Sequence, residues 1–358
     1  MIEIDGSAGE GGGQIVRTSL ALAMLTGAAI TIRNVRARRS NPGLRAQHLA
    51  AVRAAAAISG ASVHGATLAS GELRFAPGRV LAGHYEIDVG TAGSTLLVLQ
   101  TIVPALSFCS GPSEVTLHGG THNPRAPSFE FVHDAYLPLL ARLGFTVRLA
   151  LERHGFYPRG GGLIRASIGP FRGGAALELT ERGALVSKSA RVLLSRLPAH
   201  IGEREIAVLR NRLELLESAC SINAVAARSA GNTVHVRIDS THVSTVFCGF
   251  GMRGLPAEEL AAGLAAEVNQ YLRANVALDS HLADQILIPL ALAAGGCVTT
   301  MTPSGHTKTN ADIIKVFLPI RIDLRELHSG RWLITVSPRP GEGPRARGER
   351  VDYDPEHD

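Results

Sequence analysis

The sequence predicts an α/β (α+β) protein, in which a large domain of three repeated βαβαββ-like units carries a smaller inserted α/β domain. The first observation is a recurring order of elements: an apolar helix, a strand, a second helix and then a strand pair. The second is composition, because 45% of the 358 residues are hydrophobic but only 4% are aromatic. A core of Ala, Leu, Val and Ile suits helices packed on sheets. The third is the late start of the last copy, which leaves roughly one hundred residues over, the size of a small domain.

Each copy begins its first helix after a polar or glycine-rich turn, and its other elements follow in the same order. In the first copy we expect a helix at residues 14–25, a strand at 29–35, a helix at 43–58 and strands around Val63 and Leu73. In the second we expect a helix at 94–106, a strand at 114–118, a helix at 129–143 and strands near Val147 and Ile164. In the third we expect a helix at 282–294, a strand at 297–302, a helix at 311–317 and strands at 320–324 and 332–336.

An insertion at residues 182–278 accounts for the late start of the third copy. Its expected elements are a strand at 189–194, a helix at 203–217, strands near 234–238 and 245–249, and a long helix at 257–274. The large domain then comprises residues 1–181 and 279–337. Residues 338–358 are rich in Pro, Gly and charge, so we expect a disordered tail there.

Charge, cysteines and hydropathy limit the function classes. The 36 basic and 31 acidic residues give a net charge of only +5, which is too mild by itself to indicate nucleic-acid binding. The four cysteines are far apart and show no zinc-type spacing, so a reducing compartment is expected. The N-terminus lacks the pattern of a secretory signal, and no apolar run is long enough to cross a bilayer. We expect a soluble cytoplasmic protein without a membrane partner, and leave a homo-oligomer open.

The run Glu10-Gly-Gly-Gly-Gln14 stands at the start of the first predicted helix. No acidic residue follows it until Glu72, although seven arginines and two histidines lie in that interval. Glycines let backbone N–H groups approach an oxyanion, a helix N-terminus adds positive potential, and guanidinium groups bind phosphate oxygens in pairs. The segment predicts an anion site, with a flexible turn beside a solvated basic helix as the alternative.

His306 lies in PSGHTKTN, just past the strand of the third copy, where a loop that enters a helix presents side chains to a cleft. Pro303 and Gly305 favour an unusual backbone there, and Thr307, Thr309 and Asn310 suit helix capping or phosphate binding. We therefore interpret His306 as a site residue, with a structural histidine as the alternative.

Several reaction classes find little support in the sequence. It contains no GxSxG elbow and no GxxxxGK[ST] phosphate loop, and none of its three lysines lies in a recognisable nucleotidyl-transfer context. A nucleotide reaction would need another nucleophile. An imidazole can attack phosphorus and later leave as the ring regains a proton.

Seven segments together resemble the RNA 3'-terminal phosphate cyclase family. They are GEGGGQIVRTSLALA, RSNPGLRAQHL, GTAGSTLLVLQTIVPAL, GGTHNPRAP, RHGFYPRGGG, HLADQILIPLALA and PSGHTKTN. The similarity extends from Ile2 to about Val336 and covers all three copies. It implies three repeated α/β units with an inserted α/β domain. It also implies an ATP-dependent, ligase-type reaction that converts an RNA 3'-phosphate into a 2',3'-cyclic phosphodiester.

Carried over residue by residue, the resemblance implies that His306 is the catalytic nucleophile and becomes covalently adenylylated. It implies that Glu10 binds Mg²⁺ or Mn²⁺, for which a carboxylate and nucleotide phosphates are common ligands. The ATP-binding residues that it implies are Gln100, Pro127, His281, Leu282, Ala283, Asp284 and Gln285.

Basic and amide side chains near the glycine run are our candidates for the RNA phosphate end and the pyrophosphate. They are Arg17, Arg38, Arg39, Arg45 and Gln47. Three other arginines are expected to form solvated surface, and two histidines either contact RNA or pack; these are Arg33, Arg36 and Arg53, and His48 and His122.

The chain departs from the family pattern at two positions. His281 stands where we expect an aromatic residue before LADQ, which makes the contact with adenine and the nucleotide choice less defined. Gly305 stands where some relatives carry Cys, an exchange that should leave the nucleophile undisturbed.

Two alternatives come from other function classes. A cyclase-like RNA-binding protein of ribosome assembly would keep the fold without the reaction, but it would have no use for both His306 and Glu10. An enolpyruvyl transferase would have a similar repeated fold, but three lysines hardly supply its carboxylate-binding groups.

Overall fold

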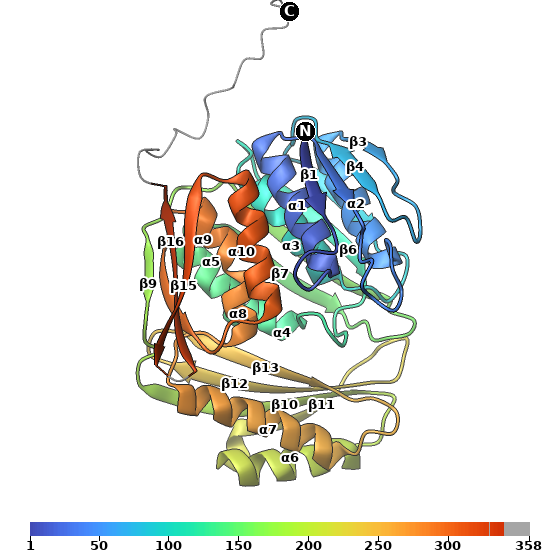
Figure 1. The fold of residues 1–358 in the computed structure, drawn as a ribbon. Coiled ribbons are helices and arrows are strands. Elements are labelled where there is room, and N and C mark those ends of the chain that lie inside the picture. Colours follow the sequence, from blue (N-terminus) through green and yellow to red (C-terminus); the bar gives the residue numbers. More distant parts are fainter. Residues whose placement is uncertain (329, 340–358) are drawn as a thin grey trace, which may run out of the picture.

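The computed structural model describes residues 1–328 and 330–339, so nearly all of the tail predicted at 338–358 lies outside the described residues. Three units of the same topology surround a shared helical core (Figure 1). The first unit contains β1 (Ile2–Asp5), α1 (Gly13–Thr26), β2 (Ile30–Arg33), α2 (Ala46–Ser59), β3 (Ser62–His64) and β4 (Leu73–Ala76). Its strands lie in the order β1-β2-β4-β3, with β1 and β2 parallel and the other neighbours antiparallel.

The second and third units repeat this arrangement. The second contains β5 (His84–Asp88), α3 (Thr95–Ser107), β6 (Ser113–Gly119), α4 (Phe129–Phe131), α5 (Leu137–Arg142), β7 (Thr146–Arg153) and β8 (Gly162–Gly169). The third contains β9 (Leu177–Leu179), α8 (Ser280–Gln285), α9 (Leu287–Leu292), β14 (Gly296–Thr300), α10 (Gly305–Phe317), β15 (Ile320–His328) and β16 (Arg331–Pro338). Their strand orders, β5-β6-β8-β7 and β9-β14-β16-β15, match that of the first unit. The α+β fold class with three βαβαββ units is therefore confirmed.

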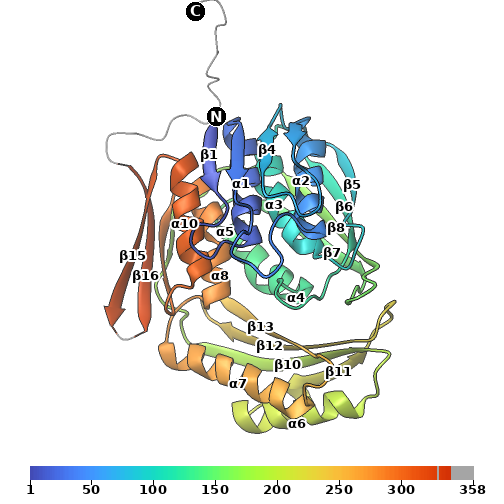
Figure 2. The same ribbon diagram turned by 45° about the vertical axis from the view of Figure 1, so that its right-hand side comes forward.

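A fourth sheet is formed by the chain between β9 and α8. It contains β10 (Leu185–Ser195), α6 (His200–Leu213), β11 (Cys220–Ala224), β12 (Gly231–Ser240), β13 (Ser244–Phe250) and α7 (Ala257–Ala274). Figures 1 and 2 show α6 and α7 on the side of this sheet that faces away from the three units. The predicted boundaries at 181/182 and 278/279 fall in the connections on either side of these elements, and the division into domains stays a prediction.

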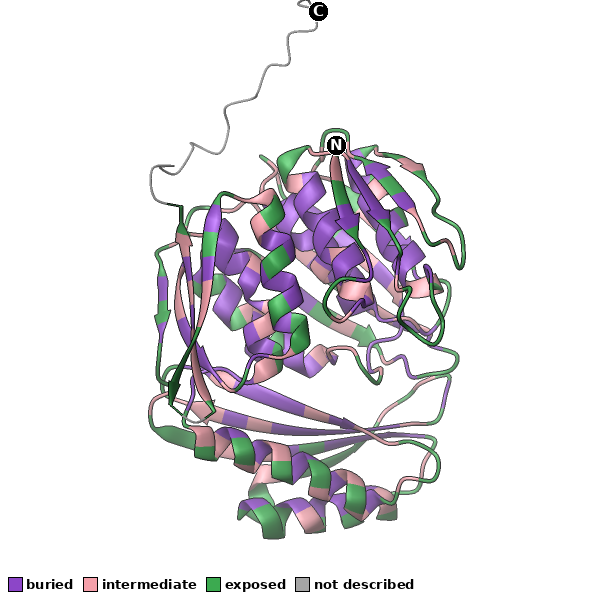
Figure 3. Cartoon of the chain, in the orientation of Figure 1, coloured by how far each residue is buried: buried purple, intermediate pink, exposed green. Residues whose placement is uncertain are grey.

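The core of the three units lies between their sheets and consists mainly of aliphatic side chains. Helix α1 packs against both α3 and α10, so the first helix of one unit contacts helices of the other two. Leu20 and Leu22 of α1 and Leu96 of α3 are fully buried. Figure 3 shows α1 as mostly buried, whereas α6, α7 and α10 each expose one face. The low aromatic content is thus matched by close packing of small and branched side chains.

Three differences from the predicted elements have physical causes. Each unit begins with a short strand, and β9 has only three residues, too few to show an alternating pattern. Helix α10 begins at Gly305 rather than at residue 311, because Ser304 caps it. The helix predicted at 129–143 contains a π-helical turn, Val132–Tyr136, two residues before Pro138, which has no N–H to donate to a regular α-helical bond.

No helix in the described part of the chain is both long and apolar enough to span a membrane.

Candidate functional site

His306 lies in the first turn of α10, at the point where the third unit meets the glycine-rich turn of the first. The Ser304 hydroxyl accepts a hydrogen bond from the N–H of Thr307 at 3.1 Å, as an N-cap residue does. This cap starts the helix before His306 and fixes the direction in which its side chain leaves the backbone. The predicted roles of Thr307 and Thr309 as caps are therefore taken by Ser304, and both threonines are buried.

The His306 ring lies between two side chains of the first unit. Its Nδ1 is 2.8 Å from Oε1 of Gln14, and its Nε2 is 2.9 Å from Oε2 of Glu10. The His306 side chain is 47% exposed, so the ring is accessible to a substrate while both nitrogens are held. An aliphatic burial of this ring, the alternative to a site role, is not what the structure shows.

The neighbours of Gln14 determine which nitrogen of His306 carries a proton. The amide nitrogen of Gln14 donates to both carboxylate oxygens of Asp284, at 2.8 and 2.9 Å. A carboxylate accepts hydrogen bonds, so this contact directs the amide oxygen of Gln14 toward His306. That oxygen can only accept, and Nδ1 of His306 must therefore be the donor. In the neutral ring the lone pair then lies on Nε2, next to Glu10.

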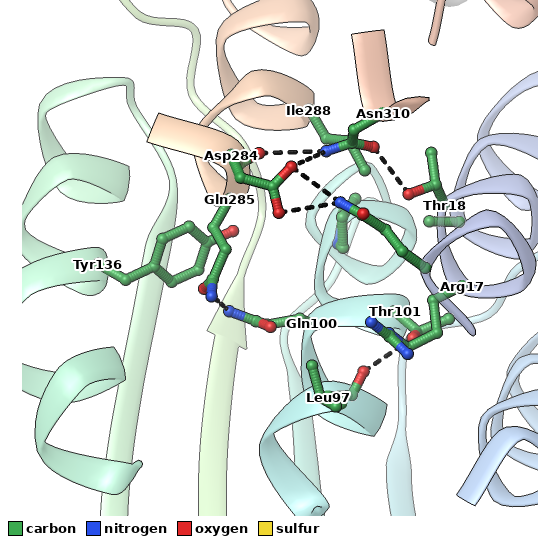
Figure 4. Close-up of a pocket in the computed structure, with 13 residues that line it drawn as sticks. Arg17, Thr18, Leu97, Gln100, Thr101, Tyr136, Asp284, Gln285, Ile288 and Asn310 are labelled. Carbon is green, nitrogen blue, oxygen red and sulfur yellow. Dashed lines mark hydrogen bonds between the residues drawn. The ribbon is translucent and has the colours of Figure 1, made fainter. Parts of the chain in front are cut away.

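A cavity lined in part by Gln14 and Asp284 lies between α1, α3, α8 and α10 (Figure 4). Asn310 connects its walls, because its amide nitrogen donates to Asp284 and its amide oxygen accepts from the hydroxyl of Thr18 at 2.8 Å. On the other side, the amide of Gln100 donates to Oε1 of Gln285 at 2.5 Å. The cavity wall is thus built from amide and carboxylate groups that suit the edges of a base or a ribose.

Burial changes the ionisation of two charged groups at this cavity. Burial raises the pKa of the Asp284 carboxyl, an effect that the amide of Gln14 and the charge of His306 oppose. Burial also lowers the pKa of Arg17 to about 10, with Asp284 opposing the shift. Arg17 stays charged at neutral pH and provides a fixed positive charge in the cavity wall.

Two glycines are required by close contacts around the site. A Cβ at Gly13 would lie 2.1 Å from Nε2 of His48, so the start of α1 and α2 approach each other only because Gly13 has no side chain. A Cβ at Gly305 would lie 2.7 Å from Cγ of Glu10. The exchange of Gly305 for a larger residue would therefore press on the carboxylate that contacts His306, contrary to the expectation that it leaves the nucleophile undisturbed.

The predicted phosphate-binding residues do not form one group. Arg39 is closest to the site, with its guanidinium 3.4 Å from Oε2 of Glu10. Arg17 faces the cavity instead, beside Asp284. The others lie around the neighbouring loop and the start of α2, where Arg38 and Arg45 are exposed and the Gln47 side chain approaches the N–H of Ser94 at 3.5 Å.

Two residues near this loop have structural contacts. The Arg36 guanidinium donates to the backbone oxygens of Asn41 and Gly43, so the expectation of a merely solvated side chain is wrong for Arg36. His48 is buried, and burial together with the charges of Arg17, Arg36 and Arg45 lowers the pKa of His48 to about 3. His48 is therefore a neutral packing residue beside Gly13.

The predicted nucleotide-binding residues separate into two sets. Gln100, Asp284 and Gln285 line the cavity. The side chains of Leu282 and Ala283 belong to the apolar core, and His281 is exposed at the start of α8. Pro127, which lies before α4, is half-buried and is not among the residues that line the cavity. For this second set, contact with a nucleotide remains a prediction.

Sequence reasoning gave no site role to Gln14 or Tyr136, and it gave Asn310 a capping or phosphate-binding role rather than a contact with Asp284. Gln14 positions His306, Asn310 connects Asp284 to Thr18, and Tyr136 lines the cavity from the π-helical turn. Gln14 and Asn310 stood within the quoted motifs, but only the fold shows that they converge from positions 270 to 292 residues apart.

Glu10 has the chemistry of a ligand for a hard divalent cation. Its carboxylate is partly exposed beside a glycine-rich turn, and Mg²⁺ is usually held by one or two carboxylates together with phosphate oxygens and water. Arg39 and His306 share the same carboxylate oxygen, so a cation held by Glu10 would lie beside the imidazole.

Comparisons with known proteins give one consistent result. The family model described as RNA 3'-terminal phosphate cyclase matches residues 8–324. A protein of that name from Ralstonia nicotianae is 48% identical over 326 residues, which cover 90% of this chain and 93% of the relative. Relatives with the same name from Salmonella enteritidis and Koribacter versatilis are 44% and 45% identical, covering 94% and 91% of this chain and 99% and 92% of the relatives.

A solved structure, the enolpyruvyl transferase NikO from Streptomyces tendae, has a TM-score of 0.34 and 12% identity. The alignment covers 93% of this chain and 47% of NikO, and at this similarity it supports no conclusion about fold or function.

Proposed function

Because the chain belongs to the RNA 3'-terminal phosphate cyclase family, we propose that it uses ATP to convert an RNA 3'-terminal phosphate into a 2',3'-cyclic phosphodiester. The observation that carries this proposal is the His306 ring. It is accessible, it is held by two side chains, and its Nδ1 proton is bound by Gln14, which leaves the Nε2 lone pair for reaction.

In the first step, Nε2 of His306 attacks the α-phosphorus of ATP, a nitrogen–phosphorus bond forms, and pyrophosphate leaves. Glu10 is 2.9 Å from Nε2, so it is placed to accept a proton from that nitrogen before the attack. A divalent cation on Glu10 would neutralise charge on the phosphates. Arg39 provides further positive charge beside Glu10, and Arg17 provides it in the wall of the cavity.

In the second step, an oxygen of the RNA 3'-phosphate attacks the phosphorus of the histidine adduct, and the imidazole leaves and regains a proton. In the third step, the adjacent ribose 2'-hydroxyl attacks the activated terminal phosphorus, and AMP leaves. The last step is intramolecular and gains from holding the reacting atoms together. ATP is needed because a phosphate dianion by itself is a poor electrophile without a good leaving group.

The nucleotide would occupy the cavity beside His306. The amide groups of Gln100 and Gln285 and the carboxylate of Asp284 face this space, and they match the hydrogen-bonding edges of a base or a ribose. The RNA end would then approach from the side of Arg38, Arg39 and Arg45, where the chain is basic and open to solvent.

The test is covalent labelling with ATP that carries ³²P at the α-position, in the presence of Mg²⁺ or Mn²⁺. We expect an acid-labile protein–AMP adduct on the wild type and none on His306→Ala. Lys308→Ala is the control, because this exposed amine, two residues further along α10, is the amine nearest to His306 in sequence. Equal labelling of His306→Ala would refute the proposal, and absence of label from the wild type would indicate an RNA-binding protein without the reaction.

A further inference from the structure

A second cluster of ligand-type side chains lies where the second unit meets the inserted sheet. His122 follows β6, Glu130 belongs to α4, and His235 lies in β12 of the inserted sheet. All three are buried, with exposures of 1%, 8% and 3%. None of them lines the cavity beside His306, so the proposed cyclisation does not use them.

The three side chains converge on one point. Each offers a ligand atom, and these atoms all lie within 4.8 Å of one another. Nε2 of His122 is 2.9 Å from Oε2 of Glu130, and Nε2 of His235 is 3.0 Å from the same oxygen. Two imidazole nitrogens and one carboxylate oxygen thus face a common centre from three different elements.

The hydrogen bonds of the described residues do not account for the burial of the His235 ring. By strict hydrogen-bond geometry neither ring nitrogen of His235 is paired among the described residues, although Nε2 lies at ion-pair distance, 3.0 Å, from Oε2 of Glu130 and the ring also interacts with Cys248. A buried imidazole whose nitrogens lack well-aligned hydrogen bonds is unfavourable. A cation between the three residues would accept the Nε2 lone pair and so satisfy that nitrogen.

The strand pattern and the neighbours of the cluster orient its ligands. Val234 and Val236 belong to the core beneath α6 and α7, so alternation along β12 directs His235 to the opposite face, toward α4. Nδ1 of His122 is 2.8 Å from the hydroxyl of Thr121, which also accepts from the N–H of Gly155 at 2.9 Å. An outer contact of this type holds a ligating imidazole in place.

Solvent can reach one side of the cluster. Glu130 and His235 line a cavity of about 230 Å³ together with Arg191 and Arg237, which lie on strands β10 and β12 of the inserted sheet. The cavity provides an entry path for an ion and space for a water ligand in addition to the three protein ligands.

We propose that His122, Glu130 and His235 bind one divalent transition-metal ion of the zinc class, which joins the inserted sheet to the second unit. Two imidazoles and a carboxylate with an open fourth position form a known zinc donor set, and imidazole favours such metals over Mg²⁺. The site is thus chemically distinct from Glu10, whose single carboxylate suits the harder cation.

The experiment uses the full chain, stripped with a chelator and then titrated with Co²⁺ and, separately, with Zn²⁺. We expect one equivalent of Co²⁺ to produce the visible absorption of a four- or five-coordinate site. We also expect Zn²⁺ to raise the melting temperature. His122→Gln and His235→Gln should each weaken binding at least 10-fold and remove the thermal shift.

Two control variants separate this site from its surroundings. His154→Gln should retain binding, because the His154 ring stacks on His122 at 5.3 Å but offers no atom to the cluster. Glu10→Ala should also retain it. Binding that survives both ligand variants and disappears in Glu10→Ala would overturn the proposal, as would less than a tenth of an equivalent bound by the wild type.

X-ray absorption keeps the proposal testable if the ligand variants do not fold. The zinc-loaded wild type should show scattering from two imidazoles. A shell of oxygen ligands alone would contradict the assignment, and the cluster would then be a buried hydrogen-bonded group without metal.

Discussion

The most informative perturbation of the site is Gln14→Met, which keeps the length of the side chain and removes both of its hydrogen-bonding groups. In the wild type, Gln14 accepts the Nδ1 proton of His306 at 2.8 Å and donates to Asp284 at 2.8 and 2.9 Å. Methionine can do neither, so the ring can rotate and either nitrogen can carry the proton. Asp284 retains Asn310 as a donor, which should preserve the fold of this region.

The expected decrease in the rate of adenylylation follows from the hydrogen bond that Gln14→Met removes. A hydrogen bond that involves a charged group contributes about 1.5–3 kcal/mol. If the Gln14–His306 bond is fully formed when Nε2 attacks phosphorus, its loss should slow adenylylation about 10- to 150-fold, since about 1.4 kcal/mol corresponds to a factor of ten. The assay is the initial rate of labelling by α-labelled ATP at saturating nucleotide.

The matched control is Gln270→Met, which makes the same exchange on the exposed face of α7. It should label at the wild-type rate. If Gln14→Met is folded, as judged by its melting temperature, and labels within about twofold of the wild type, then the inference that Gln14 fixes the tautomer of His306 is refuted.

Three further substitutions test contacts at other points of the molecule. Gly305→Ala places a Cβ 2.7 Å from Cγ of Glu10, so we expect slower labelling that higher metal concentration partly restores. Gly13→Ala places a Cβ 2.1 Å from the His48 ring, and the forced shift should lower the free energy of unfolding by about 1–3 kcal/mol in urea titrations. Glu205→Gln tests a buried carboxyl in α6, because burial raises the pKa of Glu205 to about 7. The protonated form is favoured in the native state, so stability is lost as pH rises from about 4.5 toward 7. The variant should melt at a higher temperature than the wild type at pH 8 and near it at pH 4.

Each of these expectations has an outcome that would contradict it. Wild-type labelling by Gly305→Ala at low metal concentration would mean that Glu10 is not displaced or is no ligand. An unchanged urea midpoint for Gly13→Ala would show that His48 moves aside without cost. For Glu205, the control is the exposed Glu203→Gln on the same helix, and an equal effect of both variants on the pH dependence would exclude burial as its cause.

The sequence predicted those elements whose patterns lie within one segment. The helix expected at 257–274 is α7 to the residue, because it is amphipathic, follows Pro256 and ends at Asn275 in the left-handed conformation. The strands β5, β9 and β11 were not predicted individually. They are short and partly polar, and β9 is defined by pairing with β14, more than one hundred residues further along the chain.

The site was also predictable only where its residues belong to patterns within one segment. Glu10, Asp284 and His306 belong to recognisable local motifs, and the fold brings them together around Gln14. The role of Gln14 depends on hydrogen bonds across 270 and 292 residues, which no local spacing reveals.

The second cluster illustrates this limit most clearly. No zinc motif of closely spaced Cys and His residues marks this cluster, because His122, Glu130 and His235 come from three separate elements. Only the approach of β12 to α4 places the ligands within reach of one ion. The alternation of β12 shows that His235 leaves the core face, but not which groups it meets there.

The most direct test of the central claim is to locate AMP on the protein after incubation with ATP and a divalent cation. Mass spectrometry of peptides prepared at neutral or alkaline pH should find one AMP on the peptide that contains His306. NMR of the adduct should place the phosphorus on Nε2, since Gln14 holds the proton of Nδ1. AMP on Lys308, on another residue, or on Nδ1 of His306 would contradict the account.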